Sequence, residues 1–560
     1  MGRALGGLTT VLNLLSVLTA AIAISYPAST TARIAVLVMA VLIIGHVVLE
    51  EVQSRRSGEA PALLMGKVPL PRAATALAAL ALTVAHDRSW WVVAVTSVLL
   101  ALIVVEGAVR RPVINATPQS ANIPGRDVAL PSTPVANAYF SLTTTAVLLL
   151  LVSAAFHWSQ LPATVATVAT LGAATLVGKQ SASYLIGRNR FERELPKIML
   201  ELAPAFAFHW QAPAGTAYQA TMWLPYLDRI GAPYFVLVRT IANFHEVSKM
   251  TKAPVILRVG LEDLDPVICP SMKAVFYANT AVRNSHMIRF THLTHIQLNH
   301  GDSDKIASVS PTFRQYDRNF VAGQAAIDRF AKHGVSTLPE QFEIVGRPQL
   351  EHVHQAGQPI AEIDKPTVLY SPTWSGFYED SDYSSLSAGK KIVEALLARD
   401  CTVVFRPHPY GRRHKGNARA CDEIIALLEQ HSRDTGTAHV FGPAAETEMS
   451  VVDCFNASDA MISDVSSVAS DFLISGKPFA MTAVSAHGDA FLEGFPLARA
   501  AYVIDVVKKV AGGLDEALDD MLGPDSHAST RNGLRTYYLS DTPPERITER
   551  FLEVSRSYLA

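Results

Sequence analysis

The sequence predicts an N-terminal bundle of membrane helices followed by two doubly wound α/β domains that face each other across a cleft. Long stretches of the first third contain no charged residue, and the rest of the chain alternates short apolar runs with segments of helical periodicity. The chain has 560 residues, of which 49% are hydrophobic and 18% charged. It is therefore too long for one domain and too apolar to be disordered.

Composition excludes several classes of partner and site. The 48 Lys and Arg and the 50 Asp and Glu give a net charge of -2, so no overall basic field favours nucleic acid. The four cysteines form no C-x-x-C pair, which excludes a zinc ribbon and a redox dithiol and indicates a reducing compartment.

The membrane domain is predicted from charge-free stretches. These stretches cover residues 4–32, 34–49, 73–85, 89–105 and 128–178. A helix needs about 20 apolar residues to cross the hydrocarbon core, so the last stretch holds two spans and the total is six. Two alternatives stay open: the short segment 73–85 as a buried or re-entrant helix, and the first segment as a signal peptide.

The distribution of Lys and Arg predicts the orientation of these spans. Nearly all Lys and Arg residues in the first 190 positions fall in loops on one side of the predicted spans, and only Arg33 and Arg88 fall on the other side. Because cytoplasmic loops carry the excess of positive charge, the N-terminus and everything after Lys179 are expected in the cytoplasm. No predicted span contains a formal charge within its apolar stretch, which disfavours transport by the bundle alone.

The chain is expected to have five parts. Residues 1–179 form the membrane domain, 180–212 an amphipathic linker, 213–350 the first α/β domain, 351–535 the second, and 536–560 a C-terminal helix that could pack back across the domains. Predicted strands lie at 234–238, 255–259, 288–298, 320–322 and 342–345 in the first domain, and at 367–370, 402–405, 460–462 and 479–483 in the second. Ligands in such sheets bind beyond the carboxyl ends of strands, so candidate site residues follow each strand.

The first candidate motif, NHGDSDK, follows the run 288–298. His300 can accept a proton from an attacking hydroxyl because imidazole titrates near neutrality, and Lys305 can offset charge nearby. The alternative is a turn-capping histidine. The motif also contains the D-x-D pattern of many sugar transferases, although this pattern is too short to be specific, and the spacing of His292 and His295 does not favour a shared metal ion on a strand.

Three further motifs follow strands of the second domain. RPHP follows 402–405, and its Arg406 and His408 suit phosphate on a stiff backbone, unless this is an ordinary strand-end turn. SDVSSVASD follows 460–462, where Ser466 and Ser467 could bind a diphosphate at a helix start or act only as N-caps. YSPTW follows 367–370 and offers Thr373 as a ligand contact.

Together and in this order, HGDSDK, YSPTW, RPHP and DVSSVASDF resemble the CDP-glycerol glycerophosphotransferase family of wall teichoic acid priming and polymerising enzymes. The resemblance covers residues 209–484. It implies a GT-B fold, with acceptor and donor sites in the interdomain cleft. It also implies attack on the β-phosphorus of CDP-glycerol, with CMP leaving.

The resemblance implies roles for individual residues. The expected roles are general base for His300, donor phosphate binding for His408 and Arg406, diphosphate binding for Ser466 and Ser467, a weaker donor contact for Thr373, and support from Lys305 and Asp464. The family commonly reads HGTPLK where this chain reads HGDSDK, and Ser375 replaces a basic residue often found after the tryptophan. The first departure leaves the acceptor open.

The function expected from these observations is transfer of glycerol phosphate, or a related polyol phosphate, from a CDP-activated donor to a lipid-linked acceptor at the cell membrane. No metal ion, cofactor or nucleic acid is expected. Two alternatives remain: a GT-B glycosyltransferase that uses a UDP- or CMP-sugar, and a non-catalytic membrane scaffold of a polymer assembly complex.

Overall fold

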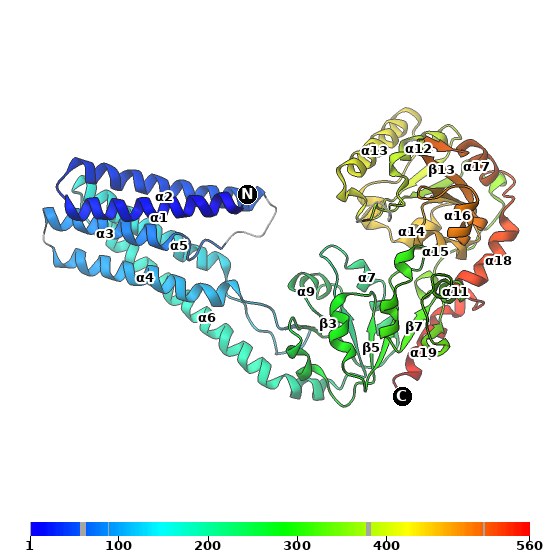
Figure 1. The fold of residues 1–560 in the computed structure, drawn as a ribbon, viewed down its shortest axis with the longest axis horizontal. Coiled ribbons are helices and arrows are strands. Elements are labelled where there is room, and N and C mark those ends of the chain that lie inside the picture. The colour runs from blue at the N-terminus through cyan, green and yellow to red at the C-terminus, as the bar shows by residue number, and fades with distance from the viewer. Residues whose placement is uncertain (1, 57–62, 88, 377–381, 508–509) are drawn as a thin grey trace. The chain divides into compact units, whose positions relative to one another are not determined.

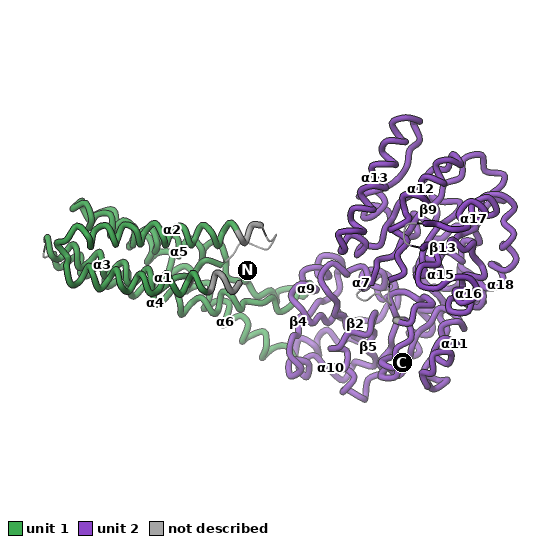
Figure 2. Tube along the Cα trace, turned by 45° about the horizontal axis from the view of Figure 1, so that its top comes forward, with its two compact units in different colours: residues 1–195 green, residues 196–560 purple. Residues whose placement is uncertain are grey.

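The structure is a computed structural model that describes all residues except 1, 57–62, 88, 377–381 and 508–509. It divides into two compact units, residues 1–195 and residues 196–560, coloured separately in Figure 2. Unit 1 is helical, and unit 2 contains both β-sheets, apart from a two-residue strand β1 (Ser120–Ala121) that precedes it in the chain.

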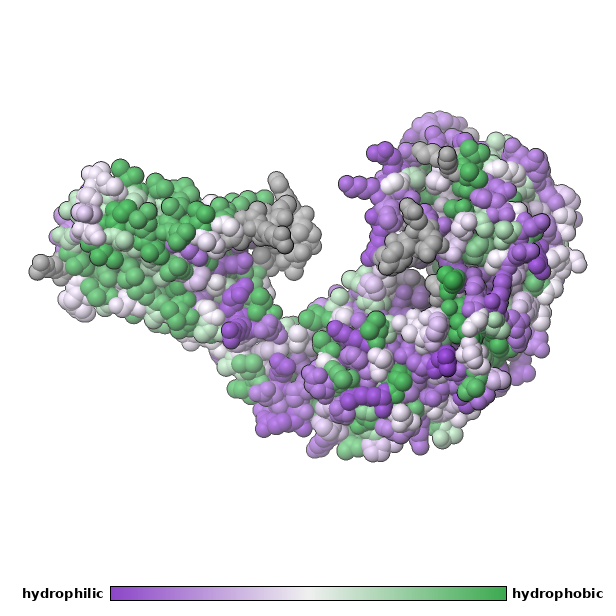
Figure 3. Space-filling view, in the orientation of Figure 1, coloured by the Kyte–Doolittle hydropathy of each residue, from purple (hydrophilic) through white to green (hydrophobic). Residues whose placement is uncertain are grey.

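Unit 1 forms a helix from each predicted span. The helices are α1 (Gly2–Ser25), α2 (Thr30–Arg56), α3 (Pro69–His86), α4 (Trp90–Ile114), α5 (Thr133–Phe156) and α6 (Leu161–Leu202), the last of which continues into unit 2. Among the described residues, five of these helices are long and apolar enough to cross a membrane. Hydrophobic side chains cover much of the visible face of unit 1, whereas the visible face of unit 2 is mainly hydrophilic (Figure 3).

The helix that falls outside those five is α3, the short segment whose assignment the sequence left open. It has 18 residues, many of them buried, and it packs against α1, α4 and α5. Its alanines fit this position because small side chains let neighbouring helices approach closely. Burial of this kind fits a central span as well as a buried helix, so both alternatives stay open and the count of six spans stays a prediction.

A buried ion pair joins α3 to α4 and was not expected from the sequence. The Nη1 and Nη2 atoms of Arg72 donate to the two carboxylate oxygens of Glu106 at 2.9 and 3.0 Å, and both side chains are fully buried. Glu106 also accepts a hydrogen bond from the backbone N–H of Gly66 at 2.5 Å. Glu106 lies one residue beyond the fourth predicted charge-free stretch, but α4 continues to Ile114 and includes it.

The first sheet of unit 2 is parallel, with its strands in the order β4-β3-β2-β5-β6-β7-β8. The strands are β2 (Phe206–Trp210), β3 (Tyr234–Val238), β4 (Val255–Leu257), β5 (Ala274–Tyr277), β6 (Thr294–Gln297), β7 (Arg318–Val321) and β8 (Phe342–Ile344). The helices that accompany them are α7 (Tyr218–Thr221), α8 (Leu224–Arg229), α9 (Ile241–Val247), α10 (Ser285–Ile288) and α11 (Gln324–Lys332) (Figure 1).

Three details of this sheet differ from the sequence prediction. The range 180–212 contains the end of α6 and all of β2, so the sheet begins before the predicted boundary at 213. Strand β5 was not predicted. The predicted strand at 288–298 is only β6, because its first residue ends α10 and a turn follows.

The second sheet has the order β10-β9-β11-β12-β13-β14, parallel except for the last pair. Its strands are β9 (Thr367–Ser371), β10 (Thr402–Phe405), β11 (Ala460–Ser463), β12 (Phe479–Ala483), β13 (Tyr502–Val507) and β14 (Val510–Gly512). The helices are α12 (Gly389–Leu397), α13 (Lys415–Thr435), α14 (Val451–Asn456), α15 (Ser467–Phe472), α16 (Asp489–Gly494) and α17 (Leu514–Met521). The sequence did not predict β13 or β14.

The chain ends with α18 (Ala528–Leu539) and α19 (Ile547–Ser557), and α19 returns to the first α/β domain. Phe551 packs on Trp223 with ring centroids 5.4 Å apart, and Arg556 Nε donates to the carbonyl of Ile230 at 2.9 Å. Two parallel α/β domains joined in this way confirm the GT-B architecture that the family resemblance implies.

Candidate active site

The loop that carries His300 lies against the serine turn of the second domain. Asn299 has a φ of 60°, which turns the chain sharply after β6. A Cβ atom on Gly301 would lie 2.6 Å from Ser467 Oγ, so a larger residue here would force Ser467 or the loop to shift. The loop from the first sheet and the turn after β11 are therefore in direct contact. This agrees with the rule that ligands in such sheets bind beyond the carboxyl ends of strands, which we call the strand-end rule.

The backbone around His300 fixes which ring nitrogen carries the hydrogen. His300 Nδ1 lies 3.0 Å from the carbonyl oxygen of Ala278. A carbonyl can only accept, so Nδ1 carries the hydrogen and Nε2 keeps a lone pair. Burial lowers the pKa of His300 below its usual value, so the ring is neutral at neutral pH. A neutral imidazole with a free Nε2 can act as a general base.

His408 has the opposite arrangement. The backbone N–H of Tyr410 donates to His408 Nδ1 at 3.0 Å, so Nε2 carries the hydrogen. Burial, and next the charge of Lys305 and the neighbouring ring of His300, lowers the pKa of His408 to about 4. The loop is held by a hydrogen bond from the His408 backbone N–H to the carbonyl of Pro372 at 2.9 Å. His408 can thus donate a hydrogen bond while it remains uncharged.

Two aromatic side chains accompany the histidines. The ring of Tyr218 is 6.4 Å from that of His300 and 6.3 Å from that of His408, edge-on to both, and Trp374 stacks on His408 with centroids 6.2 Å apart. Tyr218 was missed because the strand it follows, β2, was assigned to a linker. Applied to the correct strand, the strand-end rule would have included the loop that carries it.

Lys305 and Thr373 connect the two domains, and Asp464 orients Thr373. Lys305 Nζ donates to Thr373 Oγ1 at 3.1 Å, and burial lowers the pKa of Lys305 to about 8. Asp464 accepts from the backbone N–H of Thr373 at 2.6 Å and from Thr482 Oγ1 at 2.6 Å. Burial raises the pKa of Asp464 to about 6. The structure thus brings Lys305 to Thr373 and gives Asp464 a supporting position.

Ser466 and Ser467 stand at the start of α15. Ser466 is the N-cap residue, but its side chain makes no capping hydrogen bond and lies 3.1 Å from Ser463 Oγ instead. The N-capping alternative therefore does not account for its side chain. Ser467 lies where the His300 loop approaches, against Gly301.

Arg406 faces a different part of the domain from His408. Its Nη1 atom donates to the carbonyl oxygens of Ala445 and Met449, the latter at 2.8 Å. These carbonyls belong to the turn at 444–449, which includes a short π-helix. The alternation of side chains that would place Arg406 and His408 on one side ends with β10, because Phe405 is its last residue.

The D-x-D pattern of the His300 loop forms ion pairs with arginine. Arg329 pairs with Asp302 and with Asp304, the latter at 3.1 Å, and Asp304 also accepts from Tyr538 Oη at 2.8 Å and from the backbone N–H of Leu497 at 3.1 Å. These carboxylates therefore hold the loop between the domains. Among the described residues, no group of three or more His, Cys, Asp or Glu is placed to hold a metal ion.

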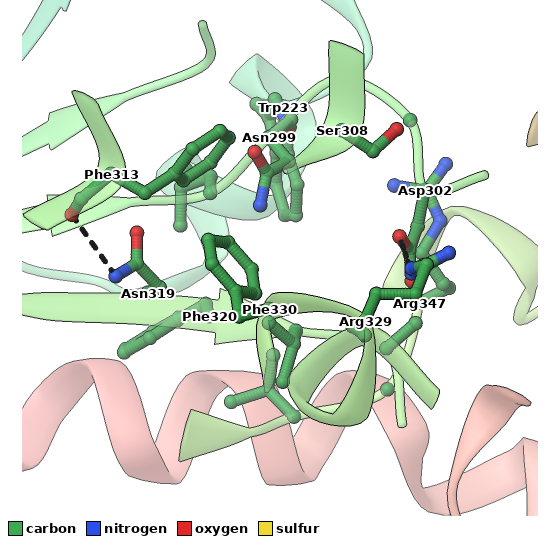
Figure 4. A pocket seen from close by; sticks show the side chains of 17 residues that line it. Trp223, Asn299, Asp302, Ser308, Phe313, Asn319, Phe320, Arg329, Phe330 and Arg347 are labelled. Atoms are coloured by element: carbon green, nitrogen blue, oxygen red, sulfur yellow. Dashed lines mark hydrogen bonds and ion pairs between the residues drawn. The ribbon is translucent and has the colours of Figure 1, made fainter. Parts of the chain in front are cut away.

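A pocket lies behind this loop (Figure 4). One end is polar, with Asp302, Arg329 and Arg347, and the other is aromatic, with Trp223, Phe313, Phe320 and Phe330. Arg347 continues the network, because it makes a two-point ion pair with Asp471 of α15 at 3.0 and 2.9 Å. His300 does not line this pocket, although both of its neighbours in the chain do.

Comparison with known proteins identifies part of the chain. Residues 353–486 match the family described as CDP-Glycerol:Poly(glycerophosphate) glycerophosphotransferase, and this range includes Thr373, Arg406, His408 and the serine turn. No curated protein matches the chain. The match confirms the resemblance inferred from the motifs for this segment.

Solved structures of similar fold cover about two thirds of the chain. A structure of the wall teichoic acid polymerase TagF with CDPG has 13% identity and a TM-score of 0.40, covering 66% of this chain and 93% of that one. A putative UDP-N-acetylglucosamine 2-epimerase from Listeria monocytogenes has 15% identity and a TM-score of 0.42, with 63% and 96% covered. HepE of Anabaena in complex with UDP and glucose has 14% identity and a TM-score of 0.37, and the match covers 63% of this chain and 100% of that one.

Proposed function

We propose that this chain, whose residues 353–486 belong to the CDP-glycerol glycerophosphotransferase family, is a membrane-bound transferase. It moves glycerol phosphate, or a related polyol phosphate, from a CDP-activated donor to a lipid-linked acceptor and releases CMP. The product is a teichoic acid or a similar cell-wall polymer. The observation that carries the proposal is the pair of histidines whose Nε2 atoms have opposite hydrogen-bonding capacity.

The two histidines have different tasks in the reaction: one takes a proton and the other donates a hydrogen bond. His300 Nε2 takes the proton of the acceptor hydroxyl while its oxygen forms a bond to the β-phosphorus of the donor. The bond from that phosphorus to the bridging oxygen breaks, and the electron pair leaves with CMP. His408 Nε2–H donates a hydrogen bond to the phosphate oxygens, including the one on which charge develops.

Lys305 supplies positive charge to this reaction. Phosphoryl transfer depends chiefly on positioning and on stabilising charge spread over the phosphate oxygens. The ammonium group is fixed at Thr373, and at pH 7 it is protonated because its pKa is about 8. Ser466 and Ser467 offer hydroxyl groups to the diphosphate from the start of α15.

The membrane helices of unit 1 support the choice of a lipid-linked acceptor. Five described helices are long and apolar enough to span a bilayer, and the last of them runs into unit 2. An enzyme confined to the membrane meets a lipid acceptor at a high effective concentration. We propose a cytoplasmic position for unit 2, because most Lys and Arg near the predicted spans fall on its side.

The test is release of nucleotide by the full chain in lipid nanodiscs. CDP-glycerol, CDP-ribitol, UDP-sugars and CMP-sugars are each offered with a lipid-diphosphate acceptor. We expect CMP from CDP-glycerol or CDP-ribitol, and loss of this release in His408→Ala with unchanged thermal unfolding. Release of nucleotide from the sugar donors alone would reject the proposal in favour of a glycosyltransferase.

A further inference from the structure

The residue before His300 is held by a buried tryptophan. Trp223, which directly precedes α8, donates its indole N–H to the carbonyl oxygen of Asn299 at 2.5 Å (Figure 4). Asn299 is the residue whose φ of 60° turns the chain after β6, so this hydrogen bond fixes the chain at the turn itself. Trp223 is almost fully buried, and its hydrogen bond is therefore formed away from solvent, where such a bond is strongest.

The C-terminal helix α19 supports this tryptophan from behind. Phe551 of α19 is fully buried between two rings of the first α/β domain: it packs on Trp223 and meets Phe320 of β7 edge-on, with centroids 6.2 Å apart. The helix can come this close because Gly346, after β8, has no side chain. A Cβ atom there would lie 2.9 Å from Cγ2 of Ile547, and the φ of Gly346 is 74°.

The other end of the His300 loop is held by α18. One carboxylate oxygen of Asp304 accepts from Tyr538 Oη at 2.8 Å and from the backbone N–H of Leu497 at 3.1 Å, and the other accepts from Arg329 Nη1 at 3.1 Å. All of these groups are buried. Each oxygen of this buried carboxylate thus has a partner, as a charge removed from water requires.

The contact with α18 belongs to the part of the loop in which this chain departs from the family pattern. Asp304 stands where HGTPLK has leucine, and a leucine could not accept a hydrogen bond from Tyr538. The position of α18 is fixed independently by its contact with the first domain. A Cβ atom on Gly323, directly before α11, would lie 2.6 Å from the carbonyl oxygen of Tyr537.

We propose that residues 528–560 form a positioning element of the active site, which holds both ends of the loop that carries His300. At one end α19 acts through Trp223, and at the other end Tyr538 of α18 acts through Asp304. A general base must lie within hydrogen-bond reach of its proton, and a small displacement costs much of the rate. This consequence for catalysis rests on the proposed function, whereas the holding of the loop does not.

The chain offers a matched control for each positioning residue. Tyr538→Phe keeps the ring and removes the hydroxyl, and its control is the neighbouring Tyr537→Phe, which removes a 2.7 Å hydrogen bond to Asp328, outside the loop. Trp223→Phe removes the indole N–H. Its control is Trp210→Phe, because Trp210 is equally buried and its N–H has no hydrogen-bond partner among the described residues.

The first measurement is amide hydrogen exchange of the full chain in lipid nanodiscs, followed by mass spectrometry. We expect exchange in peptides that cover residues 299–305 to be about tenfold faster in Tyr538→Phe and in Trp223→Phe than in their controls, because loss of a buried hydrogen bond makes local opening more frequent. Exchange in the strands of both sheets reports whether each variant is folded. Loop exchange no faster than in the controls would overturn the proposal.

The second measurement separates kcat from the KM for the CDP-activated donor in the CMP-release assay. We expect kcat to fall about tenfold in both variants and KM to stay within about twofold, because His408 and the serine turn lie outside the loop. A raised KM with unchanged kcat would instead assign the element to donor binding and reject the proposal. Exchange needs no turnover, so faster loop exchange in a chain that releases no CMP would reject the proposed function and keep the positioning element.

Discussion

His300 and His408 have the same side chain and contact the same tyrosine, yet the backbone prepares them for opposite tasks. A carbonyl oxygen fixes the ring of His300, and a backbone N–H fixes that of His408. Each ring therefore presents a different Nε2, one as acceptor and one as donor. The difference teaches that the role of a buried neutral histidine is set by the backbone group opposite Nδ1, since burial is the main cause that lowers the pKa of both rings and does not distinguish them.

The largest expected effect comes from His300→Gln. Glutamine fills a similar volume but offers no group basic enough to take a proton, so we expect CMP release to fall about a thousandfold. Single-turnover assays in nanodiscs measure this, with the exposed His333→Gln as control. Turnover within tenfold of the parent chain would show that His300 is not the base.

A smaller loss is expected for His408→Gln. The glutamine amide can still donate to a phosphate oxygen, so the expected loss is about tenfold, whereas His408→Ala removes the donor and costs more. The same single-turnover assay ranks the two variants. Equal inactivity of His408→Gln and His300→Gln would contradict the difference in role between the two histidines, because His408 would then have to move a proton as well.

The smallest effect concerns the pH profile. Because the base must be unprotonated, activity falls as the pH drops through the lowered pKa of His300. Lys305 loses its charge as the pH rises through about 8, so activity also falls on the alkaline side, by a few-fold. In Lys305→Arg the side chain stays charged at high pH. We therefore expect the fall in activity at alkaline pH to disappear, while the fall in activity at acidic pH remains. An unchanged alkaline limb would assign it to another group.

The sequence predicted those parts of the fold that depend on local pattern. Strands β10 and β12 have the predicted bounds because each is a short apolar run between turns. Strand β2 was missed because it begins within a few residues of α6, so no long turn separates it from the helical pattern. Strand β13 was missed because buried residues alternate in it with partly exposed ones. One of the partly exposed residues is the charged Asp505, so the strand does not form a continuous apolar run.

The candidate site was predicted less completely, because its geometry depends on contacts distant in sequence. The strand-end rule selected His300, His408, Thr373 and the serine turn as candidates. It could not find the ring orientation of His300, since that depends on a carbonyl 22 residues away. Nor could it foresee that Arg406 turns toward the carbonyls of Ala445 and Met449, because the alternation of a strand does not extend past its last residue.

The ion pair of Arg72 and Glu106 has a consequence for how this bundle can change over generations. A lone buried charge costs several kcal/mol, whereas a pair replaced by two apolar residues is often tolerated. A substitution at either position alone therefore destabilises the bundle. We expect the two residues to change together during evolution. Homologous chains would then keep both charges or neither, which makes their joint presence a marker of descent for this type of helical bundle.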